Sequence, residues 1–265
     1  MVNLITPKPN KTEKIFNKIY NAPPTSLTVF LLSALSGYPM GAKLICSMQQ
    51  KGLYTKQQAQ RMFAFCSVSG PTFMLGTVGI AFLKSYTAGI IVAISNLLAC
   101  LINGLIYRGK KDEFSPKFLP QVSQQNVLTE SVLDAVNSIL LVGGFVALSF
   151  LLVDMLTNLK IIGSFANLIC QIFNIKNTDV VRSFIVGTIE ITRGVLELST
   201  STCPMWIKTL LASGLVGFGG ISIIGQSFAF LHTINMPIRK MILQKFTQGI
   251  LAIIFALPLC FIFLR

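Results

Sequence analysis

Four charged residues lie within apolar stretches of this 265-residue chain, at positions where a charge needs either a function or a partner. Lys43 follows the motif GYPMGA at residues 37–42. Glu190, Arg193 and Glu197 follow one another at helical spacings of three and four residues, so they can share one helix face. Such cations could supply positive charge to a bound anion. The motifs therefore predict that Lys43 and Arg193 take part in binding a small charged solute.

Two other interpretations of these charges stay open. Arg193 could be neutralised by Glu190 or by Glu197 on its own helix, which need not exclude a role in solute binding. Lys43 has no acid near it in the sequence, so it could extend its ammonium to the membrane surface. If its motif lies deep in the protein, Lys43 must instead meet an acid from the other half of the chain or an anionic ligand.

Helix-breaking residues interrupt apolar segments at matching places in the two halves of the chain. In the first half the motif SGYPMGAK (36–43) is followed by SVSGP (67–71), and in the second half EITRG (190–194) is followed by GFGGIS (217–222). Matched interruptions of this kind mark the binding site of many transporters. The half-helices that begin there present free backbone N–H groups, which attract a carboxylate.

The polar and helix-breaking residues of these motifs form the candidate substrate site. Hydroxyl and amide groups could add hydrogen bonds to those of the helix ends, and Tyr38 or Phe73 could stack on a planar ring, although aromatic residues near a turn more often only pack. The candidate substrate-binding residues are Gly37, Tyr38, Pro39, Gly41, Lys43, Ser69, Gly70, Pro71, Thr72, Glu190, Thr192, Arg193, Gly219, Gly220, Ser222 and Gln226.

The elements that must position this site are membrane helices. The chain is 52% apolar and only 12% charged, whereas about 25% of the residues of a soluble domain are charged. About 20 apolar residues cross a bilayer core. The composition therefore predicts an all-α integral membrane protein with about five full spans, centred on the uncharged stretches Met62–Leu83, Ser85–Tyr107, Ala135–Val153, Thr209–Ile234 and Phe246–Leu264.

Other classes of function find no support in the sequence. There is a single histidine, His232, and six cysteines are scattered without a CxxC motif, so we expect no metal, no cofactor and no catalytic residues. The net charge of +13 is explained by lysines and arginines in cytoplasmic loops, so we expect no nucleic acid partner. The expected partners are the lipid bilayer, a small anionic or nucleoside-like solute, and either a second membrane subunit or further copies of the chain.

The charge pattern divides the chain into two similar halves. Residues 1–21 form a predicted cytoplasmic lead-in, residues 22–108 a first repeat of hairpin, broken helix and span, residues 109–127 a cytoplasmic linker, and residues 128–265 a second repeat. The second repeat has a span before its own hairpin, broken helix and final span.

Each predicted hairpin has two arms that are too short to span a bilayer. Ser26–Leu35 and Ala42–Gln49 flank the first Gly/Pro turn, and Arg182–Leu198 surrounds the second. These lengths favour two re-entrant hairpins, although one kinked span from Ile19 to about Ala42 is an alternative. Thr55 and Gln58 form a predicted capping box that opens the first broken helix.

Most lysines and arginines, Lys245 among them, fall on flanks that are cytoplasmic if residue 1 is cytoplasmic. In that orientation the first hairpin enters from the cytoplasm and the second enters from the other side. The two halves are then inverted repeats.

Four ordered motifs, GYPMGAK, FCSVSGPTFMLGTVG, GTIEITRG and GFGGISIIGQ, resemble the sporulation integral membrane proteins of the YlbJ type, in the nucleoside-recognition (Gate) domain group. The resemblance runs from about residue 20 to the C-terminus. It implies a protein of the mother-cell membrane around the forespore that moves dipicolinate, a small aromatic dicarboxylate, toward the spore. Better-known relatives in the Gate group bind nucleosides with paired hairpins and broken helices.

Family members usually carry further N-terminal transmembrane helices, whereas the first motif of this chain arrives within forty residues. Two alternative functions therefore stay open. One is a nucleoside transporter, and the other is a non-transporting membrane scaffold or partner subunit that spore maturation needs.

Overall fold

The computed structural model describes residues 11–109 and 127–264. These residues form helices and connecting turns, with no strand among them, which confirms the all-α prediction. The expected lead-in is described only from Lys11 onward. The expected linker at 109–127 is described only at its two ends, so its course lies outside the described residues.

The first half begins with a short amphipathic helix, continues with two pairs of short helices, and ends with a long helix. Its elements are α1 (Lys11–Tyr20), α2 (Ser26–Ser36), α3 (Met40–Gln50), α4 (Lys56–Cys66), the π-helix η2 (Thr72–Phe82) and α5 (Tyr86–Ile106). The capping box expected at Thr55 is confirmed: its hydroxyl accepts the Gln58 N–H, and the Gln58 side chain accepts the Thr55 N–H.

The second half repeats this order after one additional long helix. Its elements are α6 (Val127–Asn158), α7 (Ile161–Phe173), α8 (Thr178–Ile189), α9 (Ile191–Thr200), α10 (Met205–Phe218), α11 (Gly220–Leu231), the 3-10 turn η3 (His232–Ile234) and α12 (Ile238–Phe263).

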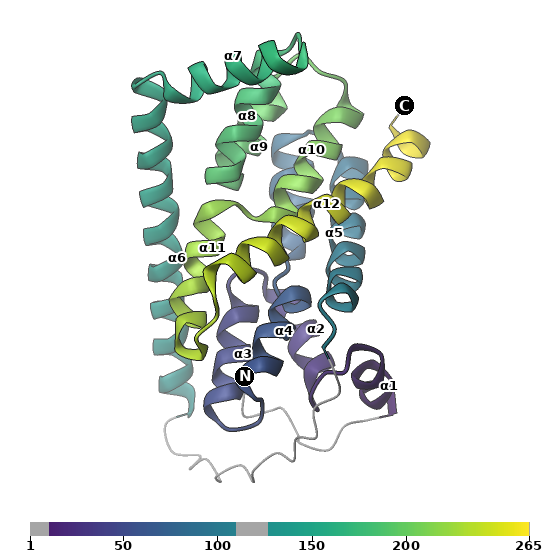
Figure 1. The fold of residues 1–265 in the computed structure, drawn as a ribbon, viewed down its shortest axis with the longest axis vertical. Helices are drawn as coiled ribbons and strands as arrows, with labels where there is room; N and C mark the ends of the chain where they lie inside the picture. Colours follow the sequence, from purple (N-terminus) through teal and green to yellow (C-terminus); the bar gives the residue numbers. More distant parts are fainter. Residues whose placement is uncertain (1–10, 110–126, 265) are drawn as a thin grey trace.

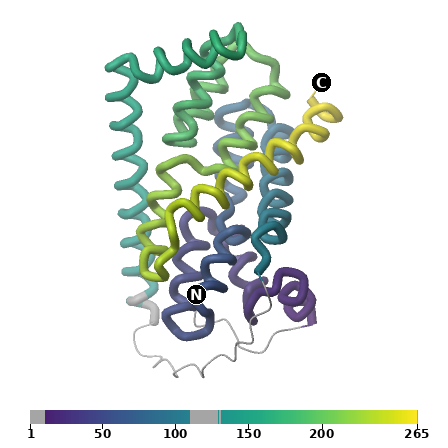
Figure 2. Tube along the Cα trace, viewed as in Figure 1, coloured from purple at the N-terminus to yellow at the C-terminus, as the bar shows by residue number. Residues whose placement is uncertain are grey.

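Figure 1 shows the two pairs of short helices at opposite ends of the molecule, with α2 and α3 in the lower half and α8 and α9 in the upper half. Helix α6 runs along one side for the full height, and α7 crosses the top. Figure 2 shows α12 running obliquely across the molecule, where it packs on α5 and α10. These contacts join α5 of the first half to α10 and α12 of the second half.

Each pair of short helices is a helical hairpin. Helices α2 and α3 pack on each other and are joined by Gly37–Pro39. Helices α8 and α9 are separated by Glu190 alone and approach so closely that a Cβ on Gly194 would lie 2.1 Å from the Cα of Gly187. Residues 26–50 thus form two helices rather than one kinked span.

Both expected broken helices are interrupted at the predicted places. Between α4 and η2, the four residues Ser67–Gly70 leave the helix. Pro71 already has helical φ and ψ angles and stands at the start of the second segment, where its missing N–H is tolerated. Between α10 and α11 the break is sharper. Gly219 and Gly220 have φ angles of +84° and +74°, a left-handed conformation that glycine adopts without steric cost.

Among the residues that the structure describes, four helical segments are long and apolar enough to cross a membrane, namely Tyr86–Ile106, Ser131–Asn158, Met205–Ile234 and Ile238–Phe263. The fifth expected span is divided at its interruption into α4 and η2, each of 11 residues. Helix α6 presents large apolar side chains outward, with Ile139, Leu148 and Leu151 between 68% and 69% exposed. A face of this kind suits a lipid environment.

The core has two main parts. One is centred on the first hairpin and α4, around Ile45, Met48 and Phe63, and also includes Leu231 of the second half. The other joins the two halves as well, because Val78 of η2 packs with Val195 of α9 and other buried residues of α5 and α10. The hairpin tips and the helix interruptions are held between these two parts.

Candidate functional site

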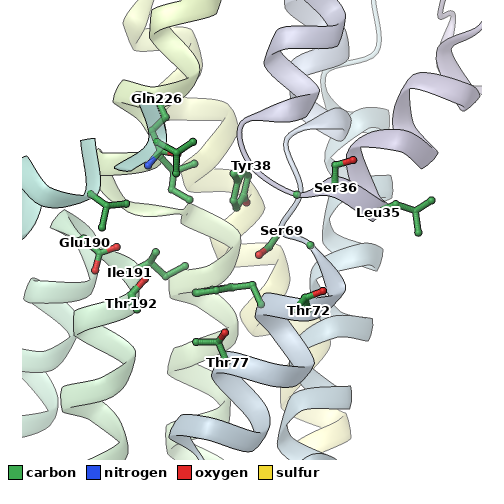
Figure 3. Close-up of a pocket in the computed structure, with 16 residues that line it drawn as sticks. Leu35, Ser36, Tyr38, Ser69, Thr72, Thr77, Glu190, Ile191, Thr192 and Gln226 are labelled. Atoms are coloured by element: carbon green, nitrogen blue, oxygen red, sulfur yellow. The ribbon is translucent and has the colours of Figure 1, made fainter. Parts of the chain in front are cut away.

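A cavity of about 380 Å³ lies where the tips of the two hairpins meet (Figure 3). In this view Glu190, Ile191 and Thr192 of the second hairpin face Ser36 and Thr72 of the first half, with Tyr38 and Ser69 between them. The lining residues are Leu35, Ser36, Gly37, Tyr38, Ser69, Gly70, Thr72, Phe73, Thr77, Val142, Val146, Glu190, Ile191, Thr192, Ile223 and Gln226.

The cavity forms because each hairpin tip packs against the helix interruption of its own half. A Cβ on Gly37, whose φ is +77°, would lie 2.7 Å from the backbone nitrogen of Gly70. In the second half, a Cβ on Gly220 would lie 3.1 Å from the carbonyl oxygens of Gly187 and Ile189. No side chain fits between these backbones, so glycine is required for the close approach.

Tyr38 connects the tip of the first hairpin to the centre of the second half. Its hydroxyl donates a hydrogen bond of 3.2 Å to the carbonyl oxygen of Val216, near the end of α10. The hydroxyl oxygen of Tyr38 also accepts a hydrogen bond of 2.7 Å from the ammonium of Lys245 on α12. Tyr38 therefore connects the lining of the cavity to the buried Lys245 through its hydroxyl group.

Lys245 is only 1% exposed, although it lies in a helix that is long and apolar enough to span a membrane. The sequence analysis puts Lys245 on a cytoplasmic flank just before the last span, but the structure has it within the helix and buried, so its expected position outside the span is wrong. Helix α12 begins at Ile238, seven residues earlier than Lys245, and this places the side chain inside the bundle. No motif in the sequence marks it; the only signal is a lysine directly beside a long apolar stretch.

The polar groups around Lys245 are all uncharged. Its Nζ donates to the carbonyl oxygen of Ser67 at 3.2 Å and to Oε1 of Gln248 at 3.0 Å. The Nε2 of Gln248 also donates to the Ser67 carbonyl oxygen, at 3.0 Å. The ion pairs found among the described residues do not include Lys245. A buried cation without a counter-ion is costly, so this position needs an explanation beyond packing.

Glu190 lies on the opposite wall of the cavity and is 1% exposed. It is the residue between α8 and α9, and its Oε2 accepts a hydrogen bond of 2.8 Å from the backbone N–H of Arg193. The carboxylate thus caps the N-terminus of α9, where the helix dipole favours a negative charge. Among the described residues that line the cavity, Glu190 alone carries a charged side chain.

Lys43 and Arg193 lie outside the lining, and both contact α6. The ammonium of Lys43 donates to Ser138 at 2.9 Å and lies 3.5 Å from a carboxylate oxygen of Asp134. Arg193 pairs with Asp154 and, at 3.4 Å, with Glu197. Among the alternatives for Lys43, the structure therefore shows an ion pair with an acid from the other half of the chain, Asp134. The expected role of these two cations in binding an anion is left untested.

The remaining candidate residues divide into two groups. Gly37, Tyr38, Ser69, Gly70, Thr72, Thr192 and Gln226 line the cavity together with Glu190. Pro39, Gly41, Pro71, Gly219, Gly220 and Ser222 do not line it. They shape the turns around the cavity or support its walls: Gln226 donates a hydrogen bond of 3.3 Å to the Ser222 hydroxyl.

Some lining residues were not among the candidate substrate-binding residues of the sequence analysis. They are Leu35, Ser36, Thr77, Val142, Val146, Ile191 and Ile223. Val142 and Val146 belong to α6, whose uninterrupted apolar sequence carries no signal of a site. Within residues 11–109 and 127–264, no group of histidine, cysteine and acidic side chains is arranged to hold a metal ion.

Membrane-spanning helices, two helical hairpins and a cavity between the hairpin tips define a polytopic α-helical integral membrane protein. The chain is 24% identical over 93% of its length to the sporulation integral membrane protein YlbJ of Bacillus subtilis strain 168, of which the matched region covers 67%. This similarity confirms the resemblance to the YlbJ type that the four motifs predict. The chain is thus similar to a membrane protein of sporulation.

No family model matches the chain, so its place in the nucleoside-recognition (Gate) domain group stays a prediction. No solved structure matches it either.

Proposed function

We propose that this chain carries a small solute across a membrane during spore formation. The observation that supports the proposal best is the cavity of about 380 Å³ between the two hairpin tips. Cavities of about 300 Å³ or more accommodate small metabolites. A site built from interrupted helices of two halves, inside a bundle of membrane spans, is the arrangement expected of a secondary transporter. A protein that only supported other subunits would not need a polar cavity at this place.

We propose further that the two halves are inverted repeats. Each half has a hairpin, an interrupted helix and a long helix in the same order, and the hairpins lie at opposite ends of the molecule (Figure 1). With the first hairpin open to the cytoplasm, exposed positions near α4 and α7 lie on opposite sides. In a cysteine-free background, Lys56→Cys should react with a membrane-impermeant maleimide only from the cytoplasm, and Lys176→Cys only from the other side.

The charges around the cavity support a small anionic solute. Gly70 and Thr72, at the N-terminal end of η2, form part of the cavity wall. The N-terminal end of a helix carries a partial positive charge, which favours an anion. Lys245 places its amino group directly behind Tyr38, and the protonated form of this group adds positive charge there. The hydroxyls of Ser69 and Thr72 can donate hydrogen bonds to a carboxylate in this wall. A buried ammonium that lacks a carboxylate partner is stabilised by an anion close to it.

Glu190 limits which anion can bind. A solute that places a carboxylate beside it must bring a proton for one of the two groups, because two adjacent carboxylates cannot both stay ionised at low cost. The cavity thus suits a planar aromatic acid with its carboxylate at the η2 wall and an uncharged or protonated group toward Glu190. Tyr38 and Phe73 offer aromatic surface for the ring.

Dipicolinate, as the resemblance implies, fits this description when it carries one proton. We therefore propose that it is the solute and that the protein acts in the mother-cell membrane around the forespore. A nucleoside is the second candidate, and the specific observation that favours it is the acidic wall at Glu190, which an uncharged solute meets without repulsion.

The test is uptake by proteoliposomes that contain only this chain. We expect saturable uptake of labelled dipicolinate that excess unlabelled dipicolinate inhibits. Uptake of labelled uridine in its place would favour the nucleoside candidate. If neither solute enters and neither raises the melting temperature of the purified protein, the transport proposal is wrong and a scaffold or partner subunit becomes the better interpretation.

A further inference from the structure

The ammonium of Lys245 is surrounded by three oxygen atoms that accept its hydrogen bonds. Its three acceptors are the hydroxyl oxygen of Tyr38 at 2.7 Å, the carbonyl oxygen of Ser67 at 3.2 Å and Oε1 of Gln248 at 3.0 Å. The three N–H bonds of an ammonium match these three acceptors. The proton of Tyr38 is already directed at the Val216 carbonyl oxygen, so the Tyr38 oxygen serves Lys245 as an acceptor.

These oxygen atoms lie at the interruption between α4 and η2. Ser67 caps the C-terminus of α4, where the first broken helix unwinds, and helix C-termini carry a partial negative charge. Tyr38 belongs to the hairpin tip that packs on the same interruption. In secondary transporters, unwound carbonyl groups and the C-terminal ends of half-helices are the groups that coordinate a coupling cation such as Na⁺.

We propose that Lys245 is an internal cation that fills a monovalent-cation site at the α4–η2 interruption. Its ammonium holds the tip of the first hairpin against α12 and the interruption, a task that a bound metal cation would otherwise perform. In its protonated form it also places positive charge behind the solute cavity. As a consequence, solute binding and transport by this chain need no Na⁺. This consequence rests on the proposed transport function, whereas the occupancy of the site by Lys245 does not.

The site itself can be tested without any solute. In the purified protein we expect the melting temperature to be the same in sodium chloride and in choline chloride of equal concentration. Lys245→Ala removes the ammonium and leaves the oxygen atoms without a donor. We expect the melting temperature to fall by about 5–10 °C in choline chloride, and to recover by at least half in sodium chloride or with added propylammonium, which replaces the missing atoms.

Two comparisons make this measurement specific. Lys240→Ala is the matched control, because Lys240 lies on the same helix, is half-buried and donates to Oε1 of Gln60 at 3.2 Å. Its melting temperature should not differ between the salts. Tetramethylammonium, which has no N–H to donate and is too large for the site, should not rescue Lys245→Ala. An unchanged melting temperature of Lys245→Ala, or an equal loss in every salt and with propylammonium, would overturn the proposal.

If Lys245→Ala does not fold, the unmodified protein supplies the second measurement. Stabilisation by dipicolinate or uridine, and uptake of either solute, should be equal in sodium chloride and choline chloride. A dependence of either quantity on Na⁺ of more than about threefold would contradict the internal-cation proposal while leaving the transport proposal intact. Failure of both solutes in both salts would contradict the transport proposal. The unmodified protein without solute would then decide the cation site, because its melting temperature should be equal in sodium chloride and choline chloride, and a clearly higher melting temperature in sodium chloride would contradict the internal-cation proposal.

Discussion

The ammonium of Lys43 lies 3.5 Å from a carboxylate oxygen of Asp134, so the first hairpin has its counter-ion on α6. The second hairpin is bound to the same helix in the same way, because Arg193 pairs with Asp154 near the other end of α6. Between these two acids, Val142 and Val146 line the cavity. The two ion pairs therefore hold α6 in place as one wall of the site.

The Lys43–Asp134 pair should contribute measurably but modestly to stability. Asp134 is 70% exposed at its side chain, so the pair is expected to contribute only about 0.5–1 kcal/mol if its surroundings are screened as at a protein surface. Lys43→Gln and Asp134→Asn should each lower the melting temperature in detergent, and the double variant should lose no more than the more damaging single change. Strictly additive losses would show that the two residues do not interact.

The solute affinity should depend little on the two hairpin cations. Because Lys43 and Arg193 face α6 and do not line the cavity, the double variant Lys43→Gln/Arg193→Gln should be less stable yet keep its solute affinity within about threefold. Equilibrium binding of dipicolinate to the purified protein would measure this. A loss of tenfold or more at normal membrane levels, about 1.4 kcal/mol, would instead support the anion-binding role that the sequence suggests.

Two substitutions of Glu190 should distinguish its role as a helix cap from the effect of its charge on solute binding. Glu190→Gln keeps an oxygen that can accept the Arg193 N–H, whereas Glu190→Ala leaves the N-terminus of α9 without its side-chain cap. We expect Glu190→Ala to cost about 1 kcal/mol of stability and Glu190→Gln to cost less.

Removing the charge of Glu190 also removes repulsion between it and an anion. Glu190→Gln should therefore bind dipicolinate more tightly and lose any proton dependence of its transport. Weaker dipicolinate binding by a well-folded Glu190→Gln protein would mean that the carboxylate itself contacts the solute.

The contact between the first hairpin tip and the helix interruption should not tolerate a side chain. A Cβ on Gly37 would lie 2.7 Å from the Gly70 nitrogen, and the φ of +77° is strained for alanine. We expect Gly37→Ala to destabilise the protein by about 1–3 kcal/mol and to distort the cavity.

Gly76→Ala is the matched control, since no atom lies within 4 Å of a Cβ at Gly76. Thermal unfolding of both variants in detergent would compare them. Equal stability of the two variants would show that the close approach at Gly37 is not required.

The sequence by itself determined the features that depend on neighbouring residues. Thr55 and Gln58 form the expected capping box because both lie within one turn of the same helix. Pro71 begins a new helical segment and Gly219 ends α10, in each case because of the covalent structure of the residue itself. Apolar stretches of sufficient length predict spans for the same local reason. Together these features predicted the hairpins, the interruptions and eight of the residues that line the cavity.

Only the tertiary structure decided which charges meet. Lys245 lies 207 residues from Tyr38 in the chain, and Lys43 meets an acid of the opposite half. The sequence analysis put Lys245 on a flank of the last span because it precedes an apolar stretch, but α12 begins earlier and the lysine lies inside the bundle. Burial and counter-ions depend on how distant helices pack, and no local pattern of residue types contains that information.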